Sequence, residues 1–468
     1  MYVEETLYLT VRELADRIRT GAMSPVELTE SYLERAKRIG PRWNAFALLT
    51  PEIALQDAHA AQLEIRAGHY RGPLHGIPYA AKDLLAVRGI PTTWGAKPYA
   101  TQTFDYDATV IVRLRQAGAI LLGKAAMIEL AGGMGYRYAS ASLTGAAKNP
   151  WDTSCWACGS SSGSGAIVAG GLAAFAIGTE TWGSIICPAA FCGVTGLRPT
   201  YGRVSRHGGM VLCSTLDKIG PLARSAGDCG LVLAAMAGHD PLDSSSLSAP
   251  EAAFSWPQTI PRGRPLRIGW VTEQMKDAQP GVVAAVDAAR RDLESAGHKV
   301  KEAKLPAGPW EPAAAVIIAA EGATAFDQLI SSGRCLELAD PSSQVGGFVG
   351  QQISGADYLR AQRVRAVLQQ RMAELFRAYD ILLAAAQNFT ATKLDANLET
   401  ELSGADPLGA IGNLCGSPAV SVPCGFDSNG RPVGLQFLGA PQADAMVLAE
   451  AEFYQRNTNW HRKHPPAV

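Results

Sequence analysis

One stretch of the sequence, residues 158–188, constrains both the fold and the chemistry more than any other. It reads CGSSSGSGAIVAGGLAAFAIGTETWGSIICP. A Gly/Ser-rich loop at residues 159–165 precedes a run of small apolar residues, and a second tight turn follows at residues 182–184. A surface linker would not need the apolar run, and a packed helix would not need so many hydroxyl groups. Two serine-bearing turns joined by a short helix can supply a nucleophile and its proton relay.

The composition predicts a densely packed α/β protein, since 47% of the 468 residues are hydrophobic and 48 are glycine. The net charge of −1 gives no electrostatic reason to expect a nucleic acid or an anionic membrane as a partner. The first residues, MYVEETLY, lack the basic-then-apolar order of a signal peptide. The longest apolar stretch, residues 165–178, is too short and too rich in glycine to span a bilayer. We therefore expect a cytoplasmic protein.

The cysteine pattern suggests thiols rather than a metal site or a disulfide framework. The chain has nine cysteines, an odd number, and Cys155 and Cys158 form a C-x-x-C pair. A zinc or redox site would need a second ligand pair or a thioredoxin-like context. Cys187 and Cys192 are spaced too far apart to form that pair, and no histidine accompanies them. We expect packed free thiols in a reducing compartment.

Helical and strand patterns alternate along the chain, which predicts an α/β architecture. Strands are expected at residues 77–83, 119–122, 266–271, 419–422 and 433–437. Helices are expected at two stretches within 9–39, at 51–67, 108–118, 225–238, 280–297 and 309–378, and from 444 onward. Thr10 and Ser24 are candidate helix caps, and Gly40-Pro41 is expected to end the second helix. Residues 240–263 are interpreted as a surface excursion rather than a domain boundary.

Residues 118–124 spell the phosphate-loop pattern G-x-x-x-x-G-K. The interior of this segment is an apolar strand rather than a glycine-rich loop, and Ala125 stands where the motif requires Ser or Thr. The segment is therefore not expected to bind phosphate.

Lys82, Ser160 and Ser184 have to be explained together. A serine is a poor nucleophile until a base takes its proton, and none of the eight histidines lies in a motif context. A lysine can act as that base when burial makes it neutral near the working pH. Lys82 ends an apolar run, although a lone lysine in that place is more often a solvated end of a strand. Residues 159–163 also fit G-x-S-x-G, with Ser161 as nucleophile, but that motif needs a preceding strand and a late histidine.

These motifs resemble the signature of the amidase-signature family of serine hydrolases. The family pattern reads roughly GGSSGG, a small-residue helix and GTDTGGSIR-P, where this chain has CGSSSG and GTETWGSIICP. Further matching blocks occur at residues 77–83, 123–124, 149–152, 189–193, 196–200 and 434–436. The resemblance implies a single α/β/α domain over residues 1–468, with a twisted mixed β-sheet covered by helices. Residues 1–65 would form a helical N-terminal layer, and residues 309–378 would form a substrate lid.

The resemblance also implies a Ser-cisSer-Lys triad. Lys82 would be the base, Ser160, after a cis Gly159–Ser160 bond, would be the relay, and Ser184 would be the nucleophile. The oxyanion hole would be formed by the backbone N–H groups of Thr181, Trp182, Gly183 and Ser184. The substrate pocket would be formed by Gly132, Gly133, Met134 and Trp182. No cofactor and no metal are implied.

Three positions depart from the family pattern. Glu180 replaces an Asp, Trp182 replaces a Gly, and Ile186 replaces an Arg. The acid and the arginine would ordinarily form an ion pair, so Glu180 needs another partner. Trp182 would place an indole ring beside the reacting carbonyl.

The expected reaction is hydrolysis of a C(=O)–N bond in a small molecule, through an acyl- or carbamoyl-enzyme on Ser184. An apolar pocket favours a neutral aryl amide or a carbamate, as in the urethane-cleaving (urethanase) branch. The alternative is the glutaminase subunit of a tRNA-dependent amidotransferase, with Arg360, Arg363 or Arg365 holding glutamine. A non-catalytic binding protein is disfavoured because all three triad positions are filled. The chain is expected to be a monomer or homodimer.

Overall fold

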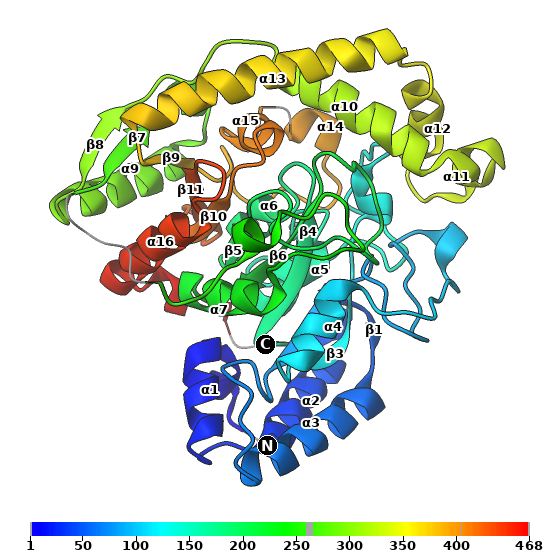
Figure 1. Cartoon of the computed structure of the whole chain (residues 1–468), viewed down its shortest axis with the longest axis vertical. Coiled ribbons are helices and arrows are strands. Elements are labelled where there is room, and N and C mark those ends of the chain that lie inside the picture. The colour runs from blue at the N-terminus through cyan, green and yellow to red at the C-terminus, as the bar shows by residue number, and fades with distance from the viewer. Residues whose placement is uncertain (1, 259–264, 403, 467–468) are drawn as a thin grey trace.

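A computed structural model describes residues 2–258, 265–402 and 404–466. In these residues eleven strands form one sheet, in the order β1-β3-β2-β4-β6-β5-β10-β11-β9-β7-β8 (Figure 1). The strands are β1 (Phe46–Leu49), β2 (Pro78–Lys82), β3 (Ile120–Ala125), β4 (Phe175–Glu180), β5 (Thr195–Arg198), β6 (Lys218–Ala223), β7 (Arg267–Trp270), β8 (Lys299–Glu302), β9 (Ile381–Ala385), β10 (Ala419–Phe426) and β11 (Pro432–Gly439).

The sheet is mixed, as expected. Strand β2 runs parallel to β3 and β4, and β7 runs parallel to β8 and β9, whereas the strands between these groups pair antiparallel. Because β2 and β4 are parallel neighbours, their carboxyl ends meet at the same edge. Lys82 ends β2 and Glu180 ends β4, so this edge carries the first residues of the predicted site.

The described residues form sixteen α-helices, most of which cover the two faces of the sheet. They are α1 (Val11–Arg19), α2 (Pro25–Trp43), α3 (Pro51–Arg66), α4 (Thr109–Gln116), α5 (Ser162–Ala169), α6 (Ile186–Cys192), α7 (Ala226–Met236), α8 (Ala249–Ala252), α9 (Pro280–Ser295), α10 (Trp310–Ala325), α11 (Asp327–Ser331), α12 (Pro341–Gly350), α13 (Gly355–Ala378), α14 (Leu398–Glu401), α15 (Gly409–Leu414) and α16 (Asp444–Thr458). The mixed sheet with helices on both faces confirms the expected fold class.

Strand β5 shows which helices lie on which face. A methyl group on Gly196 would meet Ala189 of α6, whereas the neighbouring Thr195 accepts a hydrogen bond from Gln455 of α16 at 2.8 Å. Successive residues of a strand point to opposite faces. Helices α6 and α16 therefore cover opposite faces of the sheet.

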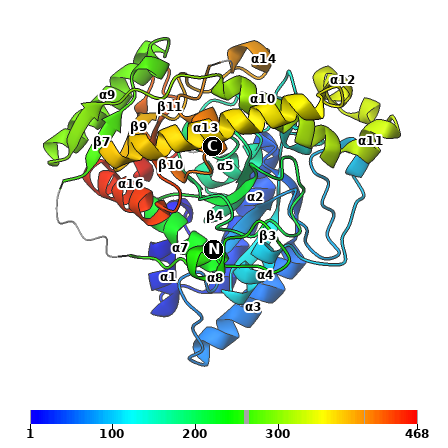
Figure 2. The ribbon, with the colours of Figure 1, turned by 45° about the horizontal axis from the view of Figure 1, so that its top comes forward.

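Helices α10–α13 form a separate layer beside the sheet, which Figures 1 and 2 show as yellow-green to yellow ribbons. Helix α10 packs against α12, α13 and α15. The prediction of a helical segment at residues 309–378 is confirmed. Residues 240–258 of the expected surface excursion include the short helix α8, and residues 259–263 lie outside the described residues.

The N-terminal segment differs from expectation in two ways. It contributes strand β1, which pairs antiparallel with β3 and was not predicted. Helix α2 also continues past Gly40-Pro41 to Trp43, so the predicted stop was wrong. A proline in the last turn removes only one backbone donor, and the fully buried Trp43 ring lies against Gly170, which stabilises that turn. Asn44, in the left-handed conformation at φ 49°, then ends the helix.

Helix α5 of the signature stretch lies unusually close to the neighbouring backbone. A Cβ atom on Gly163 would overlap the carbonyl oxygen of Ala45 and the backbone of Ala126. Gly163 N–H donates to Ala126 O at 2.8 Å, so this contact is also a hydrogen bond. The glycine content of the stretch therefore reflects close backbone packing. No described helix is both long and apolar enough to cross a membrane.

Candidate active site

Lys82 is fully buried and lies in a cluster of hydroxyl groups. Its Nζ donates to Ser160 Oγ at 2.8 Å, to Ser161 Oγ at 3.0 Å and to Thr179 Oγ1 at 2.9 Å. The Gly159–Ser160 peptide bond that presents Ser160 is cis. Strands β2 and β4 and the start of α5 thus bring Lys82 and Ser160 together, 78 residues apart in the chain.

The surroundings of Lys82 favour its neutral form. Burial lowers the pKa of Lys82 to about 7, and the negative charges of Asp217 and Glu180 oppose that shift only in part. No carboxylate is within salt-bridge distance of Nζ in the described residues. A lysine with a pKa near 7 can accept a proton at neutral pH.

The hydrogen bonds of Ser161 are those of a structural residue and do not fit the nucleophile-elbow alternative. Its Oγ donates to Thr179 O at 3.1 Å and accepts from Thr179 N at 3.2 Å, and the side chain is fully buried. Residues 150–159 before it form turns and isolated bridges rather than a strand. Ser161 therefore fastens α5 to β4.

Ser184 lies in the turn between β4 and α6. Gly183 takes φ +79° in this turn, a conformation that favours glycine. Ser184 O accepts from Ser161 N at 3.3 Å, which holds the turn against the segment that carries Ser160. The Ser184 hydroxyl has no hydrogen-bond partner among the described residues, and Ser184 lines a cavity. Of the three residues of the predicted triad, Ser184 is the one that lines this cavity.

The backbone of the same turn supplies unused donors. Within the described part of the chain, the N–H groups of Trp182, Gly183 and Ser184 make no hydrogen bond, whereas those of Ile185 and Ile186 donate to Glu180 Oε2 at 2.9 and 3.0 Å. A row of free backbone donors beside a serine can stabilise an oxyanion. Thr181, Trp182, Gly183 and Ser184 all line the cavity.

Glu180 finds its partner on β5. Arg198 Nη1 donates to Glu180 Oε1 at 2.7 Å, and Asn413 Nδ2 donates to the same oxygen at 3.1 Å. Burial opposes the ionised form of Glu180, but the positive charges of Arg198 and Lys218 outweigh it and lower the pKa of Glu180 to about 2. Arg198 thus provides the positive charge expected from the residue that Ile186 replaces. In the sequence, Arg198 stands out only as part of a matching block.

A second carboxylate holds the start of the turn. Thr181 Oγ1 donates to Asp217 Oδ1 at 2.6 Å, and Asp217 Oδ2 accepts from the backbone N–H groups of Leu212 and Cys213, both at 2.9 Å. Glu321 on α10 accepts hydrogen bonds from the next residues of this loop, including Thr215 N at 3.0 Å. Asp217 and Glu321 therefore connect the layer of helices α10–α13 to the turn of residues 181–184, which we call the serine turn. No motif in the sequence indicates this connection.

The cavity has a volume of about 580 Å³. Three segments form most of its walls. They are the serine turn together with residues 158–159, the first half of α10, and residues 398–402 and 404–406, which include α14. The described lining residues are Ala131, Gly132, Tyr136, Cys158, Gly159, Thr181, Trp182, Gly183, Ser184, Cys187, Leu212, Glu311, Pro312, Ala315, Ile318, Gln387, Leu398, Glu399, Leu402, Gly404, Ala405 and Asp406. A volume of this size suits a small organic ligand.

The predicted pocket residues divide between the cavity and the protein interior. Gly132 and Trp182 line the cavity. Gly133 and Met134 are not among its described lining residues: a Cβ atom on Gly133 would meet Leu212, and Met134 packs against Gly346 of α12. The wall formed by residues 398–402 and 404–406 was not anticipated, because its sequence has no motif.

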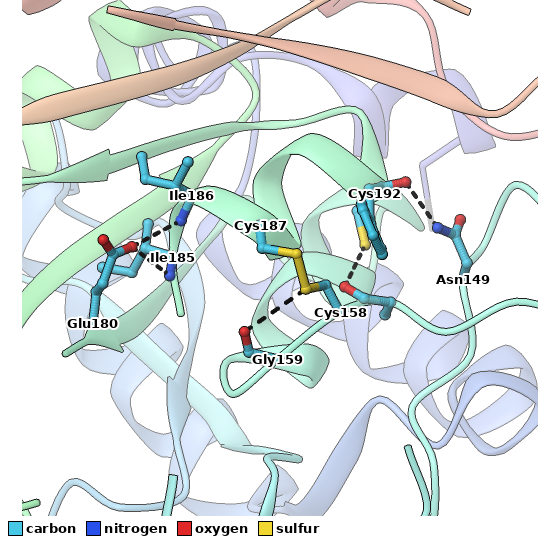
Figure 3. The surroundings of a disulfide bond; sticks show 10 residues. Asn149, Cys158, Gly159, Glu180, Ile185, Ile186, Cys187 and Cys192 are labelled. Carbon is cyan, nitrogen blue, oxygen red and sulfur yellow. Dashed lines mark hydrogen bonds between the residues drawn. A yellow bond between two sulfur atoms is a disulfide. The ribbon is translucent and has the colours of Figure 1, made fainter. Parts of the chain in front are cut away.

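The prediction that all cysteines are free thiols was wrong. Cys158 and Cys187 form a disulfide (Figure 3). The other seven cysteines are free and buried. An odd total does not exclude one pair. The two segments also lie next to each other in space, with Cα atoms 5.9 Å apart, although they are separated by 29 positions. Only the fold brings them together.

The charged groups that line the cavity are acidic. Glu311, Glu399 and Asp406 are among its described lining residues, and no lysine or arginine is. Burial, and secondarily the charge of Glu180, raises the pKa of Asp406 to about 7. Asp406 Oδ2 is enclosed and has no hydrogen-bond partner in the described residues.

The arginines expected to hold glutamine lie elsewhere. Arg360 pairs with Asp357 at 2.6 Å on an exposed face of α13, and Arg363 is exposed. Arg365 donates to Leu414 O at 2.8 Å and to Thr215 O at 3.0 Å. None of the three is among the described residues that line the cavity.

Lys124, the lysine of the phosphate-loop pattern, is buried in β3. Its Nζ pairs with Asp83 at 3.0 Å and donates to Thr92 Oγ1 at 2.7 Å. The phosphate-loop interpretation therefore has no structural basis. Among the described residues, no group of three or more His, Cys, Asp or Glu side chains is placed to hold a metal ion.

Similarity to known proteins agrees with this geometry. The family model described as Amidase matches residues 27–448, so the chain belongs to the Amidase family. A glutamyl-tRNA(Gln) amidotransferase subunit from Chromohalobacter salexigens is 39% identical over 483 aligned positions, which cover 97% of this chain and 98% of that protein.

Solved structures agree with this family assignment. The peptide amidase of Stenotrophomonas maltophilia superposes with a TM-score of 0.86 at 30% identity, covering 98% of each chain. A chain from a vestigial protein complex that reveals the evolutionary origins of an s-triazine catabolic enzyme gives a TM-score of 0.86 at 32% identity, covering 96% of this chain and 98% of that chain. The expected resemblance to amidase-signature enzymes is confirmed.

Proposed function

We propose that this Amidase-family chain hydrolyses the C(=O)–N bond of a small carboxamide through an acyl-enzyme on Ser184. The observation that carries the proposal is the buried hydrogen bond between Lys82 and Ser160, next to a serine turn whose hydroxyl and backbone donors line the cavity. Lys82 is the base, Ser160 is the relay and Ser184 is the nucleophile.

The proton moves in one direction during attack. Neutral Lys82 takes the proton of Ser160 Oγ, Ser160 takes the proton of Ser184 Oγ, and Ser184 Oγ bonds to the substrate carbonyl carbon. The N–H groups of residues 181–184 stabilise the negative oxygen of the tetrahedral intermediate. The same relay returns the proton to the leaving nitrogen, and water then hydrolyses the acyl-enzyme.

The glutaminase subunit of a tRNA-dependent amidotransferase is the second candidate. It is favoured by the similar proteins that are named as glutamyl-tRNA(Gln) amidotransferase subunits, which support this alternative better than they support carbamate cleavage. The acidic lining residues Glu311, Glu399 and Asp406 are suited to the ammonium group of glutamine. The described lining offers no positive charge for the carboxylate of glutamine, so the geometry favours an amide that lacks this group. In the amidotransferase role, the chain would also act with other proteins rather than as the expected monomer or homodimer.

One set of substrates separates these possibilities. The kcat/KM values are measured for glutamine, glutamine amide (which replaces the carboxylate by a neutral carboxamide), an aryl anilide and an aryl carbamate. A neutral or cationic amide should be hydrolysed faster than glutamine. Glutamine as the best substrate would favour the amidotransferase role. If protein that takes a fluorophosphonate label at Ser184 hydrolyses none of the four, the proposal is rejected.

A further inference from the structure

We propose that the Cys158–Cys187 disulfide positions the relay serine against the nucleophile turn, and that a thiol entering the cavity can switch the enzyme to a slow form by reducing it. The inference rests on the proposed roles of Ser160 and Ser184. Figure 3 shows the bond joining the segment before Gly159 to helix α6.

The disulfide connects the two halves of the proposed catalytic machinery. Cys158 is two residues before Ser160, and Cys187 is three residues after Ser184. Cys187 N–H donates to Gly183 O at 2.8 Å, so Cys187 is fastened to the serine turn by its own backbone. The covalent bond therefore links residues 158–160, the relay segment, to helix α6 and the serine turn that carries Ser184.

The relay segment, residues 158–160, has few backbone hydrogen bonds of its own, although the side chain of Ser160 accepts from Lys82 and the next residue, Ser161, donates its N–H to Ser184 O. In the described residues, the backbone of residues 158–160 makes one backbone hydrogen bond, from Ile128 N to Ser160 O at 3.2 Å. Cys158 has φ +63°, in the left-handed region that non-glycine residues rarely adopt. The disulfide is thus the one covalent restraint on the backbone that leads into Ser160, beside these hydrogen bonds.

The disulfide borders the cavity and is otherwise covered by the described residues. Cys158 and Cys187 are 2% and 5% exposed, and both line the cavity together with Ser184. The seven free cysteines are buried, and none of them is among the described lining residues. A small thiol should therefore reduce this pair, since the other seven cysteines are already thiols and their burial limits later alkylation, and a molecule bound in the cavity should protect the pair.

The chemistry is thiol–disulfide exchange. A dithiol such as dithiothreitol attacks one sulfur as a thiolate, the Cys158–Cys187 bond breaks, and a mixed disulfide forms. The second thiol of the reagent then attacks the mixed disulfide. Both protein cysteines are left as free thiols, and the reagent becomes a cyclic disulfide. The reagent supplies the two electrons and the two protons, and a small-molecule disulfide reverses the reaction.

Reduction should reduce kcat more than it changes KM. A misplacement of about 1 Å in a reacting group can cost on the order of 100-fold in rate. We expect kcat to fall at least tenfold on reduction, with KM within about twofold. Oxidised glutathione should restore the rate.

The test combines activity with cysteine mapping. The protein is treated with dithiothreitol, the exposed thiols are alkylated, and the labelled peptides are identified by mass spectrometry. Labelling should appear at Cys158 and Cys187 in step with the loss of kcat, and a competitive inhibitor should slow both. Unchanged kcat after complete labelling of this pair would overturn the proposal, as would alkylation of all nine cysteines in unreduced, denatured protein.

Two variants complete the experiment. Cys158→Ser/Cys187→Ser should have the low kcat of the reduced enzyme and no response to dithiothreitol. Cys155→Ser changes a buried free thiol three residues away and should keep the full response. If the double variant does not fold, the reduction experiment on the natural chain still decides the question. Activity that survives Ser184→Ala would instead reject the proposed function, whatever the redox result.

Discussion

Lys82 Nζ lies 2.8 Å from Ser160 Oγ, and the two side chains are 0% and 1% exposed. Because the pair is shut off from solvent, the protonation of Lys82 depends on burial rather than on a counter-ion. This relationship makes the pH dependence of the reaction a direct test of the site.

We expect kcat/KM for a neutral amide to rise about tenfold per pH unit below pH 7 and to level off above it. Burial lowers the pKa of Lys82 to about 7, so the lysine is charged and inactive below that pH and neutral above it. Lys82→Met should remove this limb. Lys218→Met is the matched control: burial also lowers the pKa of Lys218 to about 7, but its Nζ donates to Asn413 Oδ1 at 2.6 Å rather than to a triad residue. The assignment fails if the limb persists without Lys82.

Ser184→Ala should abolish labelling by a fluorophosphonate and lower kcat on the order of 10⁴-fold or more, since nothing else in the cavity can form the acyl bond. Ser160→Ala should lose less, because a water molecule can partly replace a relay but not a nucleophile. Ser161→Ala tests the nucleophile-elbow alternative, since this variant should still take the fluorophosphonate label at Ser184. Label mapped to Ser161 in the natural chain would contradict the site.

The Glu180–Arg198 pair should govern stability in acid. The pKa of Glu180 is about 2 in the fold against a usual value of 4.5, so its contribution is complete above pH 4.5 and is lost as the pH falls toward 2. This shift corresponds to about 3 kcal/mol of unfolding free energy. In Glu180→Gln, the unfolding free energy should decline less steeply between pH 5 and 3 than in the natural chain. Urea titration at each pH measures this free energy. An unchanged slope would mean that other carboxylates dominate.

Asp406 should discriminate between charged substrates. Burial raises the pKa of Asp406 to about 7, so the preference for a cationic over a neutral amide should grow as the pH rises through 7. Comparing the two substrates at each pH cancels the shared contribution of Lys82. Asp406→Asn should make the ratio of the two kcat/KM values, cationic over neutral amide, independent of pH. If this ratio does not change with pH in the natural chain, Asp406 does not take part in substrate binding.

Trp182→Ala should lower kcat/KM for an aryl anilide about tenfold and leave a small aliphatic amide within about twofold. The indole lies in the cavity wall beside the serine turn, where aromatic contact contributes ~0.5–1.5 kcal/mol beyond area burial. Equal losses for both substrates would show that the ring supports the turn rather than the substrate.

The sequence predicted the elements whose information is local. Strands at β2, β3, β7, β10 and β11 have apolar runs of the right length, and the cap at Thr10 is a complete capping box with Glu13. Lys82, Ser160 and Ser184 could be singled out because each lies in a motif, although their roles still await experiment.

What the sequence did not reveal depends on contacts between distant segments. Arg198 reaches Glu180 only because β5 and β4 both flank β6, and the Cys158–Cys187 pair depends on how α6 packs beside the relay segment. Asp406 reaches the cavity from a segment without periodicity. The end of α2 was misjudged because the burial of Trp43 outweighs a local stop signal.

The close contact of Gly163 with the backbone at Ala45 and Ala126 means that the walls of the cavity differ in how freely they can vary. Any side chain at that glycine would push α5, and with it Ser160, out of place. The cavity wall that contains Glu399 and Leu402 has no such restriction, since Glu399 is exposed and Leu402 is partly exposed. Efforts to evolve new substrate preferences should therefore place their mutational libraries in residues 398–402 and 404–406 and the first half of α10.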